Sequence, residues 1–280
     1  MSSPNDSVLF RRSGSQISLI SGFIYPPDDQ TPVGCVGGQP TVDNTDSVSV
    51  LQGPDTDDQN VGFDLRHGPL APGASPESDG ASEIEFDLDM SGDSGVFVVG
   101  TDAPDSFSVA LLDAMHYAVD FNETGFPEAG EPDLRFGPVL GLSLFGAGGV
   151  DVINGAGVPK PSSRALYQSM TLVGGSEHDQ LIGGGSSSDL YGGGGRDLLL
   201  GSVGSDLLSG GGASDRIVGG RGKDTVETID GKRDRVQCGA SKDRVLADRR
   251  DKAKRCEEIR RVGKRKHRFP LLPEPIFPVR

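Results

Sequence analysis

The chain has 280 residues, of which 42 are glycine and 19 are proline, and it contains no tryptophan. This composition argues against a thick conventional core and favours, in one or two domains, a thin solenoid that buries narrow rows of Leu, Ile and Val; no stretch approaches the roughly 18 apolar residues of a membrane-spanning helix. The charge is divided, because residues 1–231 hold 10 Lys and Arg against 34 Asp and Glu whereas residues 232–280 hold 17 against 7, and so acidic a first part favours bound cations over nucleic acid.

Residues 1–40 are expected to be an irregular N-terminal segment and linker. They are polar and contain the run Pro26-Pro27-Asp28-Asp29, which is typical of a connecting segment. The start of the chain does not resemble a signal peptide, since the apolar run that follows Arg12 is short and interrupted by serine. Cys35 has no visible partner in the sequence.

Residues 41–142 are predicted to be β-rich and to resemble a β-helix. Short runs of alternating polar and apolar residues are separated by Gly, Pro and Asp, which is typical of strands. We expect strands at residues 47–51, 60–65, 83–88, 95–99, 106–110 and 117–121. Their spacing favours an irregular β-helix that leads into the next region, with a β-sandwich as the alternative.

Residues 87–93, Asp-Leu-Asp-Met-Ser-Gly-Asp, resemble the start of an EF-hand loop. The twelfth position is Val98 where an EF-hand has a glutamate, and the flanks alternate like strands, so an EF-hand is not expected. A secondary calcium turn and an acidic β-turn both remain open for this segment.

Residues 143–246 repeat a pattern about every nine residues, in which an aspartate follows a glycine-rich tract and an apolar residue stands two positions later. The aspartates are Asp151, Asp179, Asp189, Asp197, Asp206, Asp215, Asp224, Asp234 and Asp243. The apolar residues are Ile153, Leu181, Tyr191, Leu199, Leu208, Ile217, Val226, Val236 and Val245. Because only 34% of the chain is hydrophobic, this phased series argues against a flexible glycine-rich linker.

The most regular copies, residues 192–200 and 219–227, resemble the nonapeptide G-G-x-G-x-D-x-U-x of RTX, or haemolysin-type, calcium-binding proteins of bacteria. The resemblance implies an all-β fold, a parallel β-roll or β-helix solenoid. Glycines permit the positive φ angles of tight turns and let backbone carbonyls approach a cation, while the x-U-x triplet forms a short strand with U inward. Calcium takes six to eight oxygen ligands, so turn carbonyls and aspartates of neighbouring coils are expected to hold several Ca²⁺ ions.

The candidate metal ligands combine the aspartates of the repeats with the glycines of the most regular turns. They are Asp151, Asp179, Asp189, Asp197, Asp206, Asp215, Asp224, Gly192, Gly193, Gly195, Gly201, Gly204, Gly210, Gly211, Gly219, Gly220 and Gly222. Other copies are imperfect. The fourth-position glycine is replaced by Glu177, Ser187 and Ala213, and the second-position glycine by Ala147 and Ser202.

The register of the aspartates predicts how the coils stack. If two nonapeptides make one coil, aspartates eighteen residues apart lie on one side, as Asp179, Asp197 and Asp215 do, and Asp206 and Asp224 lie on the other. Steps of ten and eight around Asp189 sum to eighteen and restore this stack. After Asp224 the spacing lengthens and the turn glycines disappear, so we expect calcium binding to fade and Asp243 to contribute little.

The flanks of the repeats carry three further predictions. Residues 155–170 interrupt the repeats and are predicted to be a protruding loop insertion. Residues 247–280 are predicted to be a C-terminal cap followed by a basic, Pro-rich disordered tail, whose cluster at residues 264–268 could contact an anionic polymer. Cys238 and Cys256 lie one coil apart, so a capping disulfide is expected, with two reduced thiols as the alternative.

The sequence holds no recognisable catalytic motif. H-E-x-x-H and G-x-S-x-G are absent and the four histidines are isolated. We therefore expect a non-enzymatic protein that folds on binding calcium and is extracellular or on the cell surface, where calcium is abundant. Its export would use an upstream start or a signal-independent route. The alternatives are an adhesin or polysaccharide-binding module in residues 41–140 with purely structural calcium, and a divergent enzyme.

Overall fold

The fold is all-β, as the sequence predicts. The computed structural model describes residues 8–13, 16–21, 47–51, 60–67, 85–89, 94–113, 116–121, 132–137, 139–158 and 169–262. Across these ranges the chain forms strands and one short 3₁₀ helix, η1 (Leu65–His67). None of the described segments is a helix long and apolar enough to cross a membrane.

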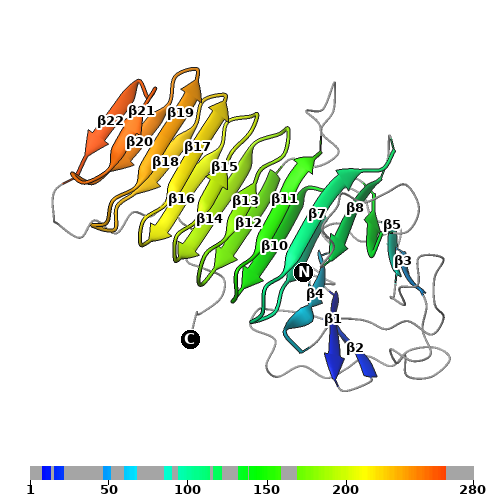
Figure 1. The fold of residues 1–280 in the computed structure, drawn as a ribbon. Helices are drawn as coiled ribbons and strands as arrows, with labels where there is room; N and C mark the ends of the chain where they lie inside the picture. Colours follow the sequence, from blue (N-terminus) through cyan, green and yellow to red (C-terminus); the bar gives the residue numbers. More distant parts are fainter. Residues whose placement is uncertain are drawn as a thin grey trace, which may run out of the picture.

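The strands form two eleven-stranded sheets that face each other along the molecule (Figure 1). Sheet one contains, in spatial order, β2 (Gln16–Ser21), β1 (Val8–Ser13), β4 (Asn60–Asp64), β6 (Gly95–Val99), β10 (Gly141–Ala147), β12 (Ser169–Gly175), β14 (Ser188–Gly194), β16 (Leu207–Gly212), β18 (Thr225–Thr228), β20 (Arg244–Ala247) and β22 (Glu258–Arg261). Sheet two contains β21 (Lys252–Lys254), β19 (Arg235–Ala240), β17 (Arg216–Arg221), β15 (Leu198–Leu200), β13 (Gln180–Ile182), β11 (Val152–Gly157), β7 (Ser106–Leu111), β8 (Tyr117–Phe121), β9 (Leu134–Phe136), β5 (Glu85–Asp89) and β3 (Ser47–Leu51).

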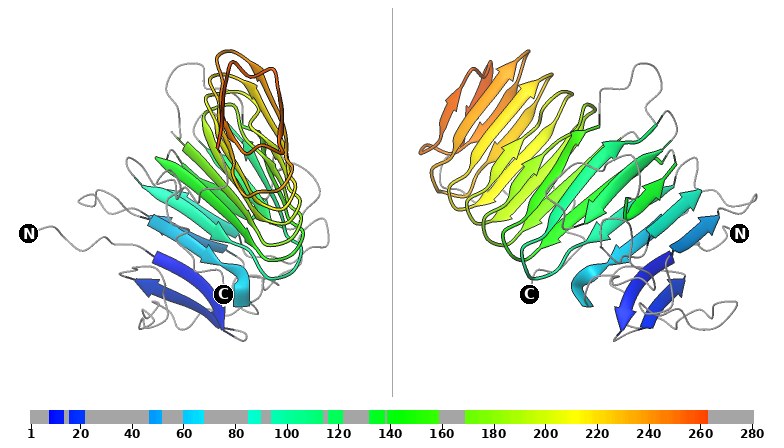
Figure 2. Two further views of the ribbon diagram at one scale, coloured as in Figure 1. Left: turned by 90° about the vertical axis from the view of Figure 1, so that its left-hand side faces the viewer. Right: turned by 45° about the vertical axis from the view of Figure 1, so that its right-hand side comes forward.

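From β10 onward the chain alternates strictly between the two sheets, so each coil contributes one strand to each sheet. Neighbouring strands pair in parallel, and in the most regular part of the solenoid residue i pairs with residue i+18, as Leu199 does with Ile217. The left panel of Figure 2 shows the last coils nearly end-on, as a flattened loop with two long sides. This is the parallel β-roll that the repeats predict.

In the repeats, the core is centred on one row of apolar side chains from each sheet. The middle residue of each short strand points inward and is at most 2% exposed. Sheet one contributes Leu172, Leu190, Leu208, Val226 and Val245, and sheet two contributes Ile153, Leu181, Leu199, Ile217 and Val236. One predicted member was wrong, because Leu190 rather than Tyr191 is buried in β14, and Tyr191 points to the outer face and is half-buried.

The described strands within residues 41–142 continue the same two sheets as the repeats, which favours the predicted β-helix over the β-sandwich. All six predicted strands are present, with β5 shifted to Glu85–Asp89. The solenoid is irregular here, because β8 pairs antiparallel with both β7 and β9. Asp87 lies in β5, and the rest of the EF-hand-like turn, residues 90–93, lies outside the described residues.

The expectation that residues 1–40 are irregular was wrong for residues 8–13 and 16–21. β1 and β2 form an antiparallel hairpin, and β1 also pairs in parallel with β4, so the hairpin ends sheet one. Its core contact is aromatic: the ring of Phe10 stacks on Phe63 with centroids 5.3 Å apart. Cys35 lies outside the described residues.

Two other boundaries differ from the sequence prediction. The loop insertion does not begin at residue 155, because β11 continues to Gly157; residues 159–168 lie outside the described residues. At the C-terminal end, β21 and β22 add one more parallel coil to the solenoid, so the predicted cap is part of the roll. The basic tail, residues 263–280, lies outside the described residues.

Candidate metal-binding turns

The turns between strands line the two long edges of the solenoid, and each ends on a polar residue that starts the next strand. Edge one carries Asp105, Asp151, Asp179, Asp197, Asp215, Asp234 and Asp251, which lead into sheet two. Edge two carries Ser188, Asp206, Asp224, Asp243 and Glu257, which lead into sheet one. We number each repeat so that the aspartate is position six, which makes Gly192 position one and Asp197 position six.

Along each edge, every carboxylate is tied to the coil before it. The N–H of Asp179 donates to Oδ1 of Asp197 at 2.9 Å, and the N–H of Asp197 donates to Oδ1 of Asp215 at 3.0 Å. On edge two, the N–H of Asp206 donates to Oδ1 of Asp224 at 3.0 Å. One carboxylate oxygen therefore satisfies a buried backbone donor and fixes the stacking of successive coils.

The second carboxylate oxygen of these residues is buried and has no hydrogen-bond partner in the described part of the chain. This holds for Oδ2 of Asp151, Asp179, Asp197, Asp206, Asp215, Asp224, Asp243 and Asp248. All but Asp248 are at most 3% exposed. Burying an ionised carboxylate oxygen without a donor or a cation is costly. A row of such atoms is the strongest single indication of a ligand in this molecule.

In the regular repeats, glycine at position one leaves room for the carboxylate of position six, which points at it. A Cβ at Gly192 would lie 2.4 Å from Oδ2 of Asp197 and 2.5 Å from the carbonyl oxygen of Gly210, one coil on. A Cβ at Gly201, Gly210 or Gly219 would likewise lie too close to Oδ2 of the position-six aspartate of its own turn. The turns that begin at Gly192, Gly201 and Gly219 thus bring a carboxylate oxygen and a backbone carbonyl of the next coil together around a bare Cα.

Positions two and four adopt positive φ angles, which form the tight turn. Gly193 and Gly195 have φ of 103° and 119°, and Gly211, Gly220, Gly204 and Gly222 take the same conformation at their positions. The imperfect copies keep this backbone without glycine: φ is 75° at Ala147, 77° at Glu177, 78° at Ser202 and 82° at Ala213. Such residues cost about 1–2 kcal/mol each. The turn is therefore retained at a cost where the sequence departs from the pattern.

Loss of hydration on burial raises the pKa of these carboxyls. For Asp197 it raises the pKa to about 7, the N–H of Asp179 lowers it in part, and repulsion from Asp215 raises it further. The pKa is likewise raised to about 7 for Asp151, Asp206 and Asp234, and to about 6 for Asp179 and Asp215. Near neutral pH both the neutral and the charged form of these stacked carboxyls are therefore populated. A cation would favour the charged form.

The donor set fits a hard cation bound mostly by backbone oxygens. No three His, Cys, Asp or Glu side chains converge as a metal cluster among the described residues. A cation in these turns would have to take most of its ligands from carbonyls, with Oδ2 of the position-six aspartates as the charged ligands. Calcium accepts six to eight oxygens of this kind in flexible geometry. Zinc, which prefers nitrogen and sulfur, does not suit the site.

The structure stacks Asp179, Asp197 and Asp215 on edge one and Asp206 and Asp224 on edge two, as the register predicts. The prediction for Asp189 was wrong. Ser188 occupies the ladder position, with its N–H donating to Oδ1 of Asp206 at 2.8 Å, and Asp189 lies on the outer face of β14. The turn before Ser188 also lacks positive φ, including at Ser187.

The geometric reason for discounting Asp243 was also wrong. The turn from Cys238 to Asp243 keeps the repeat backbone, with φ of 124° at Gly239 and 99° at Ser241. Asp243 is fully buried and its Oδ2 is unpartnered. The turn that departs is the one before Asp234, which is one residue longer. The turn from Cys238 to Asp243 therefore has the conformation of a regular repeat, although its sequence lacks most of the repeat glycines.

Two further ladder members stand beyond the predicted repeats. The N–H of Asp105 donates to Oδ1 of Asp151 at 2.9 Å, and a Cβ at Gly100 would lie 2.6 Å from Oδ2 of Asp105. Asp251 ends edge one by accepting from the N–H of Asp234. Gly100, five residues before Asp105, is the sequence signal for this position. A search for the complete nonapeptide misses it.

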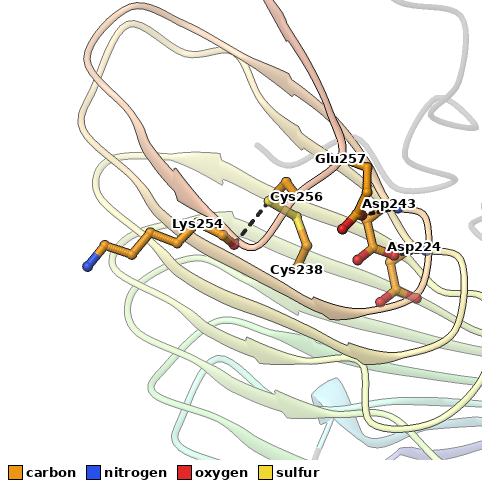
Figure 3. The surroundings of a disulfide bond; sticks show 6 residues. All are labelled: Asp224, Cys238, Asp243, Lys254, Cys256 and Glu257. Carbon is orange, nitrogen blue, oxygen red and sulfur yellow. Dashed lines mark hydrogen bonds between the residues drawn. A yellow bond between two sulfur atoms is a disulfide. The ribbon is translucent and has the colours of Figure 1, made fainter.

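A disulfide joins Cys238 of β19 to Cys256 of the last coil, with their Cα atoms 5.2 Å apart (Figure 3). This is the pair that the sequence predicts. Cys238 is fully buried and belongs to the hydrophobic core, and Cys256 packs against it in a partly buried position. The bond ties the last coil to the coil beneath it.

Comparison with known proteins agrees with this geometry. Residues 171–199 and 191–226 match the RTX calcium-binding nonapeptide repeat, in its haemolysin-type form of four copies. No protein of curated function and no solved structure matches the chain. The matched residues contain Asp179, Asp197, Asp206, Asp215 and Asp224, which are aspartates of the two edges.

Proposed function

We propose that this chain, whose residues 171–226 carry RTX calcium-binding nonapeptide repeats, is a non-enzymatic protein in which several calcium ions between stacked turns hold the solenoid folded. The row of buried, unpartnered Oδ2 atoms along both edges carries this proposal. Oδ2 of Asp151, Asp179, Asp197, Asp206 and Asp224 each lies beside a backbone carbonyl of the neighbouring coil, so a cation there would meet ligands from two coils at once. Calcium would supply the positive charge that the chain lacks in these turns.

Repulsion between stacked carboxylates makes folding of the solenoid depend on calcium. Stacked strands lie about 4.8 Å apart, and two unit charges at that distance repel by roughly 3 kcal/mol at an effective dielectric constant of 20. Each inward side chain of the core contributes only about 1.5–3 kcal/mol on burial. Ordering the many glycines costs conformational entropy. The two terms are of similar size. Ions that bind only the folded coils therefore decide the balance by mass action.

An extracellular or cell-surface location is part of the proposal. Calcium sites of modest affinity are filled where calcium is abundant, which is outside cells. The disulfide between Cys238 and Cys256 suits an oxidising compartment.

Calcium titration of the full chain by isothermal calorimetry tests the proposal. The parent is expected to bind several ions, and Asp197→Ala is expected to lower the stoichiometry because it removes an edge carboxylate. Asp189→Ala is the matched control: it lies in the same repeats but on the outer face of β14. Equal losses from Asp189→Ala and Asp197→Ala, or no calcium binding by the parent, would contradict the proposal.

A further inference from the structure

The last coil brings the end of edge two next to the disulfide. On this edge the N–H of Asp224 donates to Oδ1 of Asp243 at 3.0 Å, and the N–H of Asp243 donates to Oε2 of Glu257 at 2.8 Å. Figure 3 shows the three carboxylate side chains one above another, beside the bonded cysteines. Glu257 directly follows Cys256. The disulfide therefore anchors the residue that closes this edge.

Cys238 stands at position one of the Asp243 turn, where the regular repeats have glycine. Its carbonyl oxygen would lie 2.6 Å from a Cβ at Gly219, and Oδ2 of Asp224 would lie 2.4 Å from that same point. Gly210 has the equivalent relationship to Gly192 and Asp197 in the regular repeats. The backbone of a disulfide-bonded residue thus takes the place of a repeat glycine beside a buried carboxylate.

This end of edge two has unsatisfied carboxylates. Asp224 and Asp243 are at most 1% exposed, and their Oδ2 atoms have no hydrogen-bond partner among the described residues. The turn between Cys238 and Asp243 keeps the two positive φ angles of the regular repeats. Two buried oxygens aimed into a preserved turn indicate a missing cation.

Edge one ends differently at the same end of the solenoid. Asp251 accepts from the N–H of Asp234 at Oδ1, and from Thr228 Oγ1 and the N–H of Asp248 at Oδ2. The guanidinium of Arg261 donates to the carbonyl oxygens of Asp248 and Asp251. Protein donors therefore satisfy both carboxylate oxygens of Asp251, although Oδ2 of the neighbouring Asp248 has no partner among the described residues, whereas no protein donor reaches Oδ2 of Asp224 or of Asp243 on edge two.

The last coil buries little apolar surface. Its strand β22 is exposed along its whole length, and Ile259 is 39% exposed. Ala253 and Cys256 are the hydrophobic residues of this coil that pack against the core, and both are only partly buried. With so little apolar burial, strand pairing, hydrogen bonds and the covalent link hold the segment that carries Glu257, and the disulfide is the one covalent contact among them.

We propose that the turns Gly219–Asp224 and Cys238–Asp243 form a terminal calcium site, of which the second turn lies beyond the matched repeats, and that its occupancy is set by the oxidation state of Cys238 and Cys256. The inference rests on the proposed function in taking calcium as the ion. A dithiol reductant would transfer two electrons and two protons, break the S–S bond to give two thiols, and be oxidised to its own disulfide. Reduction would release Cys256 and Glu257 and loosen the Cys238 carbonyl, so the terminal ion would be lost while the ions of the regular repeats remain.

The test uses the full chain with Cys35→Ser, which leaves only the Cys238 and Cys256 pair. Calcium stoichiometry is measured by calorimetry for the oxidised protein and for protein reduced with dithiothreitol. The oxidised form is expected to bind one ion more than the reduced form. Cys256→Ser in the same background is expected to reproduce the loss without a reductant, with far-UV circular dichroism at saturating calcium showing that its solenoid is intact.

Asp243→Ala separates a metal site from a merely structural effect of the disulfide. In the oxidised protein it is expected to lose one ion, and reduction is then expected to cause no further loss. Identical isotherms for oxidised and reduced parent, or an undiminished response of Asp243→Ala to reduction, would overturn the inference. Failure of the oxidised parent to bind any calcium would instead refute the proposed function itself.

Discussion

The backbone N–H of Asp197 donates to Oδ1 of Asp215, eighteen residues further along the chain, at a distance of 3.0 Å. Oδ2 of the same Asp215 carboxylate is buried and unpartnered. One oxygen thus holds two coils in register and the other faces the turn, where a cation would bind. Coil stacking and ion binding therefore share the same side chain.

Asp215→Asn separates these two roles. The amide oxygen can still accept from the N–H of Asp197, but the charge is lost. Without calcium, Asp215→Asn is expected to be more stable than the parent at pH 8, because a desolvated charge has been removed. With calcium it is expected to be less stable. Asp215→Ala, which leaves the buried N–H unsatisfied at a cost of about 1–3 kcal/mol, should be less stable than Asp215→Asn in both conditions, as measured by thermal unfolding.

Gly210→Ala is expected to destabilise the protein and weaken calcium binding. The added Cβ would lie 2.3 Å from Oδ2 of Asp215, so the carboxylate or the backbone must move, which we expect to cost more than about 2 kcal/mol. Gly212→Ala is the matched control, because its Cβ would meet nothing closer than 3.8 Å. Chemical denaturation of both variants decides this. Equal destabilisation by the two substitutions would show that the turn has no special requirement at position one.

Leu199→Ala is expected to cost about 2–5 kcal/mol, because Leu199 is fully buried in the single row of core side chains. The adjacent Leu198 points to the outer face of β15 and is half-buried, so Leu198→Ala should cost clearly less. Urea unfolding in saturating calcium provides the comparison. A similar loss for both residues would contradict the assignment of the inner and outer faces.

Much of the fold could be predicted because the repeats encode it twice, in the aspartates and in the apolar residues two positions later. Both series identify the inward residues Leu181, Leu199 and Ile217 and their register. The error at Asp189 has a physical origin. Serine can start the strand as aspartate does, and Leu190 and Tyr191 are both apolar neighbours, so neither series could fix the register there.

Other features could not be predicted because the sequence pattern and the backbone conformation are not equivalent. Ser241 takes a positive φ without being glycine, and Cys238 fits position one with a side chain. These substitutions hid the Asp243 turn. The N-terminal hairpin was missed because its polar and charged residues gave no clear alternation, although Phe10 and Ile17 are buried.

The raised pKa values predict opposite pH dependences with and without calcium. The pKa of Asp151, Asp197 and Asp206 is about 7 in the folded state, against about 3.9 in an unfolded chain. The calcium-free fold therefore binds protons more tightly than the unfolded chain. Its stability from these groups is full below about pH 4 and is lost as the pH rises to about 7.

Calcium affinity is expected to change in the opposite direction, rising between pH 5 and pH 8 because protons compete with the ion at these carboxylates. Thermal unfolding in metal-free buffer and calcium titration at the two pH values check both trends. Asp197→Asn combined with Asp215→Asn should flatten the metal-free dependence. An unchanged pH dependence in this double variant would place its origin in the net charge of the whole chain.

Circular dichroism of the full chain, in chelator and then with millimolar calcium, measures whether calcium holds the solenoid folded. We expect loss of β-structure in chelator at pH 8, because stacked carboxylates repel and the core is thin, and its recovery on adding calcium. Magnesium should substitute poorly, because it demands tighter octahedral geometry. The same β-structure and the same unfolding temperature in chelator and in calcium would instead show that packing alone holds the solenoid and that calcium has no part in its folding.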